Sequence, residues 1–161
     1  MEDKYSELRY LTQAHLGATW EMVKAGAELE GEDAVMGQVL KQHPEYFDVW
    51  ENAATAPTHE EVLRDGVNPF LHVTIHQTVE NQIADRTPPQ AAETLETLMQ
   101  AGYTRHEAIH AIGNLIASEI FGIMKEDRPF DEASYIEELN ELAQKEKRPQ
   151  KRRRSRRKKR Q

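Results

Sequence analysis

The sequence predicts an all-α protein: a single helical bundle of about six helices with a disordered basic C-terminal tail. Apolar residues recur at intervals of three and four along almost the whole chain, which is the period of an amphipathic helix. No segment shows the convincing alternation of a β-strand. Glycine and proline divide the helical segments from one another. At 161 residues, the chain has room for one domain and a tail.

Three helices are expected in the first third of the chain. The first covers about residues 2–26 and is closed by Gly26, because glycine readily adopts the left-handed conformation that ends a helix. The second covers 32–43 and is stopped by Pro44. A short third helix is expected over 44–53, followed by a polar connection that contains proline.

The signals are sharper in the rest of the chain. Asn68 is a predicted N-cap, and Pro69 occupies the first helical position, where its missing N–H does no harm. Gly102 closes the next helix, Thr104 caps another, and Asp131 opens the last. The helices expected between these signals cover residues 70–85, 89–100, 105–126 and 132–147.

Charge divides the chain into two parts. The sequence has 21 basic and 28 acidic residues, a net charge of −7, but residues 147–161 carry 11 basic residues and no acidic one. Residues 1–146 therefore hold 10 basic residues against 28 acidic ones, a net charge of −18. We predict an acidic α-helical domain over 1–146 and a disordered Lys/Arg-rich tail over 147–161.

The same composition excludes several classes of function. The chain has no cysteine, so disulfides, thiolate metal sites and a cysteine nucleophile are excluded. The N-terminal residues are acidic and polar, unlike a signal peptide. No run approaches the roughly 18 apolar residues of a membrane span. We expect a cytoplasmic protein that does not contact the membrane.

The segment HEAIH, residues 106–110, has the letters of a zinc protease helix, in which two histidines bind zinc and the glutamate is the general base. Its context favours another interpretation. Thr104 and Glu107 have the spacing of a capping box, which would occupy the glutamate in the first helical turn. No third ligand of the familiar downstream kind follows, so a peptidase is disfavoured.

A second pair of histidines lies on another helix. His72 and His76 are four residues apart, and Glu80 follows four residues later, so all three share one face. They border an apolar stripe, and His106 and His110 flank a second one. If the stripes face each other, the four imidazoles meet at the rim of the core, with the Glu80 or Glu107 carboxylate nearby. The two stripes are Leu71, Ile75, Val79 and Ile83, and Ile109, Ile112, Ile116, Ile120 and Ile123.

These residues are therefore candidate ligands for a divalent transition metal. The donors suit Zn²⁺, Fe²⁺, Mn²⁺ or Ni²⁺ without selecting among them. Four nitrogens alone would make a closed structural site, and fewer would leave a position for water. Two alternatives remain: structural histidines that pack and hydrogen-bond at the core edge, and a pH-responsive contact. The candidate metal ligands are His72, His76, His106, His110, Glu80 and Glu107.

Four stretches together resemble an uncharacterised bacterial family, domain of unknown function 1841. They are HPEY at 43–46, NPFLHVTIHQTVENQ at 68–82, RHEAIHAIGNLIASEIF at 105–121 and RPFDEASYIEEL at 128–139. The resemblance covers about residues 10–142 and implies a helical fold without an established activity. The family's motif histidines fall on His72, His76, His106 and His110, whereas the position of Glu107 need not be glutamate. The resemblance does not account for the tail.

The tail, KRPQKRRRSRRKKRQ, is typical of a segment that contacts polyanions through their phosphates. RNA, DNA and the ribosome are candidate partners, and no aromatic residue is present for base stacking. The alternative is that the tail folds back on the acidic domain.

Three functions are left open: a metal-binding helical module, a non-metal adaptor whose tail binds nucleic acid or the ribosome, and a metal-dependent hydrolase using Glu107 or Glu80. The sequence names no reaction, and we favour a non-enzymatic protein.

Overall fold

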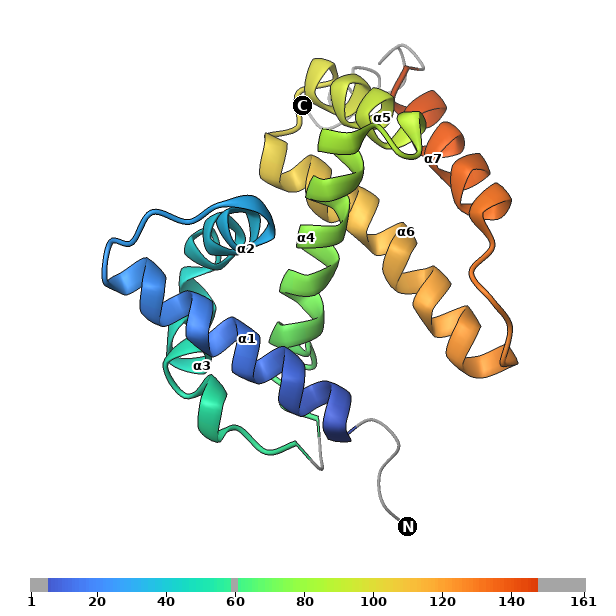
Figure 1. The fold of residues 1–161 in the computed structure, drawn as a ribbon. Helices are drawn as coiled ribbons and strands as arrows, with labels where there is room; N and C mark the ends of the chain where they lie inside the picture. The colour runs from blue at the N-terminus through green and yellow to red at the C-terminus, as the bar shows by residue number, and fades with distance from the viewer. Residues whose placement is uncertain (1–5, 59–60, 148–161) are drawn as a thin grey trace, which may run out of the picture. The chain divides into compact units, whose positions relative to one another are not determined.

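The protein is described by a computed structural model over residues 6–58 and 61–147 (Figure 1). Helices account for most of these residues, which confirms the all-α class. The only β-type pairing among them is an isolated bridge between Arg64 and Val67. No helix in the described part of the chain combines the length and the apolarity that a membrane crossing needs.

The chain divides into two compact units, which we call the N-terminal unit, Met1–Glu80, and the C-terminal unit, Asn81–Gln161. The division falls within one helix, α4. The tail predicted over 147–161 lies outside the described residues except for Lys147, the last residue of α7. The domain boundary predicted after residue 146 stays a prediction.

The N-terminal unit contains the three helices expected in the first third of the chain and the first part of α4. The short third helix is broken into three pieces, because Pro44 and the two alanines at 53 and 54 begin separate 3₁₀ turns. The elements are α1 (Ser6–Lys24), α2 (Gly31–Lys41), η1 (Pro44–Tyr46), α3 (Phe47–Glu51), η2 (Ala53–Thr55) and α4 (Pro69–Asp85).

The core of the N-terminal unit is one apolar cluster in which α1 packs against α2, α3 and η2. Polar contacts fix α1 against α3: the Trp20 indole N–H donates to Glu51 Oε1 at 2.9 Å, and Lys24 Nζ donates to Glu51 Oε2 at 2.7 Å. The cluster comprises Leu16, Trp20, Met36, Val39, Leu40, Val49, Trp50, Ala53, Phe70 and Val73.

The C-terminal unit is built from α5 (Pro89–Gln100), α6 (Arg105–Glu126) and α7 (Glu132–Lys147), whose bounds match the predicted ones. The helix α5 packs against both others, and Figure 1 shows α7 running back along α6. Buried side chains join these elements. Thr94 Oγ1 on α5 donates to the Leu139 carbonyl on α7 at 3.2 Å, and the Tyr135 hydroxyl on α7 donates at 2.7 Å to Gln82 Oε1 in the part of α4 that belongs to this unit.

An ion pair holds the turn between α6 and α7. Arg128 donates to both carboxylate oxygens of Glu119, at 2.6 and 3.0 Å, and the Asp131 N–H donates to Glu119 Oε1 at 2.8 Å. The Arg128 guanidinium and the Asp131 N–H lower the pKa of the Glu119 carboxyl from 4.5 to about 2. Because Glu119 is only 7% exposed, these partners replace the water that its charge requires.

Glu119→Gln should therefore lower the urea midpoint of unfolding at neutral pH. A carboxylate with a depressed folded-state pKa stabilises above its unfolded pKa, and this contribution is lost as the pH falls toward the folded value. The difference between wild type and variant should shrink from about pH 5 to about pH 2, the value to which the pKa of Glu119 is lowered. Unfolding followed by circular dichroism at several pH values measures it.

The matched control is Glu126→Gln, which removes the same charge from an exposed carboxylate that also accepts a bond from Arg128. Its effect should be small, because exposed ion pairs contribute little. Equal pH profiles for the two variants would contradict this account.

Candidate metal centre

The helix α4 begins where the sequence predicts, and its cap sets the register of the histidines. Asn68 Oδ1 accepts hydrogen bonds from the N–H groups of Phe70 at 3.0 Å and Leu71 at 3.1 Å. In this register His72 and His76 lie one turn apart on one face. His76 is buried, with 2% of its surface exposed, and His72 is half-buried.

The predicted apolar stripe of α4 is partly wrong. Leu71 is 41% exposed, whereas Phe70 and Val73 enter the core cluster of the N-terminal unit. The predicted Ile75 and Val79 are buried, but apolar residues stand at both 70 and 71, and the core takes up Phe70 at the start of the helix. His76 is itself one of the buried residues of α4. On α6, Ile109, Ile112 and Ile116 are buried as predicted.

A third histidine joins this pair. His43 follows the end of α2, stopped by Pro44, and has no exposed surface. Its Nδ1 lies 2.7 Å from the Val39 carbonyl oxygen. Because a carbonyl can only accept, Nδ1 carries a proton, and Nε2 is the nitrogen that holds the lone pair when the ring is neutral. Metal-binding histidines are commonly oriented in this way, with the second ring nitrogen donating to a backbone carbonyl.

The three rings form a compact cluster, which we call the imidazole cluster: His43, His72 and His76. The Nε2 atoms of His43 and His72 are 3.0 Å apart. The ring centroids are separated by 4.8 Å for His43 and His72 and by 4.6 Å for the other two pairs. One nitrogen of His43 lies within 4.8 Å of one nitrogen of His76. Tyr46 packs its ring 6.2 Å from His43 and 6.0 Å from His72.

Sequence reasoning missed His43 as a site residue, because it has no second histidine at helical spacing. The cluster instead pairs the end of α2 with a helix that begins after a long connection. A signal was available: HPEY, which begins at His43, is one of the stretches that carry the family resemblance.

The second predicted pair lies in the C-terminal unit. His106 and His110 are half-buried in the first two turns of α6, with their Nε2 atoms 3.0 Å apart and their ring centroids 4.5 Å apart. The pair thus adopts the side-by-side arrangement that H-x-x-x-H spacing predicts. Because His72 and His76 belong to the other unit, the sharing of one ion by the two pairs stays a prediction.

The capping box predicted at Thr104 is confirmed. Glu107 donates its N–H to Thr104 Oγ1 at 3.2 Å, and Glu107 Oε2 accepts from the Thr104 N–H at 2.8 Å and from its hydroxyl at 2.9 Å. These hydrogen bonds, the backbone one first, lower the pKa of the Glu107 carboxyl. The engagement of this carboxylate favours a structural role over that of a general base. Glu80, half-buried one turn after His76, stays a predicted ligand.

Comparison with known proteins identifies the family. A family profile matches residues 9–141, which include all five histidines described above. The chain belongs to the family described as Domain of unknown function (DUF1841). The resemblance inferred from the four sequence stretches is thereby confirmed. The comparison with curated proteins and the comparison with solved structures each found no match. Membership in DUF1841 thus fixes a family without supplying a reaction.

The role of Glu107 can be tested through its cap partner. Thr104→Ala should destabilise the protein by about 1 kcal/mol, because the Glu107 N–H loses its acceptor. Thr97→Ala is the matched control: the hydroxyl of this threonine donates to the Glu93 carbonyl one turn back, at 3.0 Å, and alanine has the higher helix propensity. Urea unfolding measures both variants. If Thr104→Ala lowers the free energy of unfolding no more than Thr97→Ala does, the cap does not hold Glu107. A general-base role for Glu107 would then no longer be disfavoured.

Proposed function

We propose that this protein is a metal-binding helical module, and that the imidazole cluster in the N-terminal unit holds a divalent transition metal. The observation that supports the proposal most strongly is the hydrogen bond from His43 Nδ1 to the Val39 carbonyl. It fixes the ring orientation and the tautomer before any ion arrives, so His43 has a ligand's geometry.

The spacing of the nitrogens fits a common ion. Zinc–nitrogen bonds are about 2.0–2.1 Å long, so two imidazole nitrogens on one tetrahedral ion lie roughly 3–3.5 Å apart. The 3.0 Å between the Nε2 atoms of His43 and His72 agrees with this separation. The same distance fits a hydrogen bond between two neutral rings, which is the structural alternative. The metal site and the structural alternative differ in whether a metal ion or a proton lies between the two nitrogens.

The chemistry of the donor atoms narrows the choice of metal ion. Imidazole nitrogens suit Zn²⁺, Fe²⁺ and Ni²⁺, and an all-nitrogen set is less suited to Mn²⁺, which prefers oxygen ligands. The burial of His43 and His76 favours a structural ion over a catalytic one. His106 and His110, with Glu80 as the carboxylate, are the further ligands that the sequence proposes.

Zinc should bind the full-length protein with one equivalent taken up by the imidazole cluster. Wild type titrated with Zn²⁺ is expected to gain thermal stability, by about 2.7 kcal/mol at a free concentration one hundred times Kd, and to lose it with a chelator. His43→Ala and the double variant His72→Ala with His76→Ala should abolish both effects. Calorimetry and metal analysis by mass spectrometry provide the readouts.

His15→Ala is the matched control, because His15 is an exposed α1 histidine whose Nε2 lies 3.4 Å from Asp33 Oδ1, outside the imidazole cluster. It should bind zinc as wild type does. The double variant His106→Ala with His110→Ala decides whether the second pair contributes to the same ion. Wild type that gains no stability with zinc, iron or nickel would overturn the proposal and leave structural histidines.

We propose a second activity for residues 147–161: electrostatic contact with nucleic acid or the ribosome. The support is compositional, namely 11 basic residues and no acidic one. Lysine and arginine neutralise phosphates and release counterions, which gives binding with little sequence preference. This assignment makes the protein an adaptor whose tail and helical domain have separate partners, and it agrees with the predicted cytoplasmic location.

Removal of residues 147–161 should abolish binding to RNA and to DNA, while the metal binding of the remaining chain is retained. For the intact protein, the logarithm of the binding constant should fall steeply with the logarithm of salt concentration. Fluorescence anisotropy with labelled RNA and DNA of equal length measures both. Nucleic-acid binding by the truncated protein, or a binding constant that does not change with salt concentration, would contradict the assignment.

A further inference from the structure

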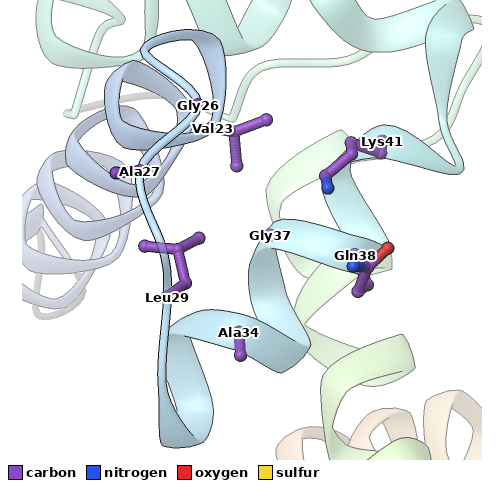
Figure 2. Close-up of a pocket in the computed structure, with 8 residues that line it drawn as sticks. All are labelled: Val23, Gly26, Ala27, Leu29, Ala34, Gly37, Gln38 and Lys41. Carbon is purple, nitrogen blue, oxygen red and sulfur yellow. The ribbon is translucent and has the colours of Figure 1, made fainter.

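A small cavity lies in the N-terminal unit between the end of α1, the loop after it and α2 (Figure 2). Its volume is about 250 Å³. This is below the range of about 300–1,000 Å³ that accommodates drug-sized ligands, so a small molecule fits best. It is lined by Val23, Gly26, Ala27, Leu29, Ala34, Gly37, Gln38 and Lys41.

One wall of the cavity is apolar. Figure 2 shows Val23 and Leu29 projecting toward α2 from the side of α1 and the loop. Gly37 allows the close approach of the two sides, because a Cβ there would lie 2.7 Å from Leu29 Cδ1 and 3.2 Å from Val23 Cγ2. Apolar atoms on this wall can cover a short hydrocarbon chain.

The opposite wall carries a cation and an amide but no acidic residue. Figure 2 shows the Lys41 ammonium nitrogen turned toward the space beside Gly37. The N-terminal unit has 15 acidic and 5 basic residues, yet none of the carboxylates in its described part pairs with Lys41. Lys24 and Arg64, by contrast, are paired with Glu51 and Asp48.

We propose that this cavity binds a small monocarboxylate with a short aliphatic chain. The carboxylate accepts hydrogen bonds from Lys41 Nζ and the Gln38 amide, and the chain lies against Val23, Leu29 and Ala34. A charge-assisted hydrogen bond at one end and apolar burial at the other give the ligand one orientation. The proposal rests on residues distinct from the imidazole cluster, so the two stand or fall separately.

The test is a titration of the full-length, ¹⁵N-labelled protein with hexanoate, followed by amide chemical shifts. We expect saturable shifts confined to residues 23–41, with a dissociation constant on the order of 1 mM, as suits so small a ligand. Hexylamine, with the same chain and the opposite charge, should produce none of these shifts. Saturable shifts from hexylamine at the same residues, or no saturation by hexanoate, would overturn the proposal.

Variants separate the two parts of the site. Lys41→Met should weaken hexanoate binding at least about tenfold, the effect of a lost hydrogen bond to a charged group. Lys125→Met is the matched control, an exposed lysine of α6 whose replacement changes the net charge equally and should leave binding unchanged. Ala34→Leu should fill the cavity and block hexanoate while the amide spectrum elsewhere stays that of the folded protein. Equal affinity in Lys41→Met and wild type would contradict the assignment.

Discussion

The hydrogen bond between His43 Nδ1 and the Val39 carbonyl is the constraint on which the imidazole cluster depends. Pro44 stops α2, and the Val39 carbonyl in its last turn accepts from the Gln42 N–H at 3.1 Å as well as from the His43 ring. A fully buried imidazole would otherwise carry an uncompensated N–H. Since this bond uses one nitrogen, the other is directed toward His72 and His76 on α4. The hydrogen bond at the end of α2 thus orients His43 as a candidate ligand.

The cluster joins two places that the chain separates by a long connection. The described residues between 44 and 68 form the short elements η1, α3 and η2, whose packing relies on Trp50 and its neighbours in the core. An ion bound by His43 and by the histidines of α4 would cross-link the two ends of this connection. Such a cross-link would reduce the conformational entropy of the unfolded chain and stabilise the N-terminal unit. The C-terminal unit uses different means: Arg128 and Glu119 fix its α6–α7 turn, and a capping box begins α6.

Local signals predicted most of the fold, and non-local pairing explains what they missed. Asn68, Thr104 and Asp131 act as caps through their own side chains, so a few neighbouring letters sufficed to place α4, α6 and α7. The same locality predicted the two H-x-x-x-H pairs. Local sequence signals did not identify His43 as a site residue, because its partners are 29 and 33 residues away and only the packing of α2 near α4 brings them together. The choice between Phe70 and Leu71 as core residue likewise depended on tertiary packing.

The most direct test of the central claim is the state of the His43 ring nitrogens, observed by long-range ¹H–¹⁵N correlation in ¹⁵N-labelled protein before and after addition of Zn²⁺. The account predicts a protonated Nδ1 in both spectra, and an Nε2 resonance that moves to the position of a metal-bound nitrogen when zinc is added. The rings of His72 and His76 should respond at the same equivalent. An unprotonated Nδ1 in His43, or three rings whose resonances ignore zinc, would contradict it.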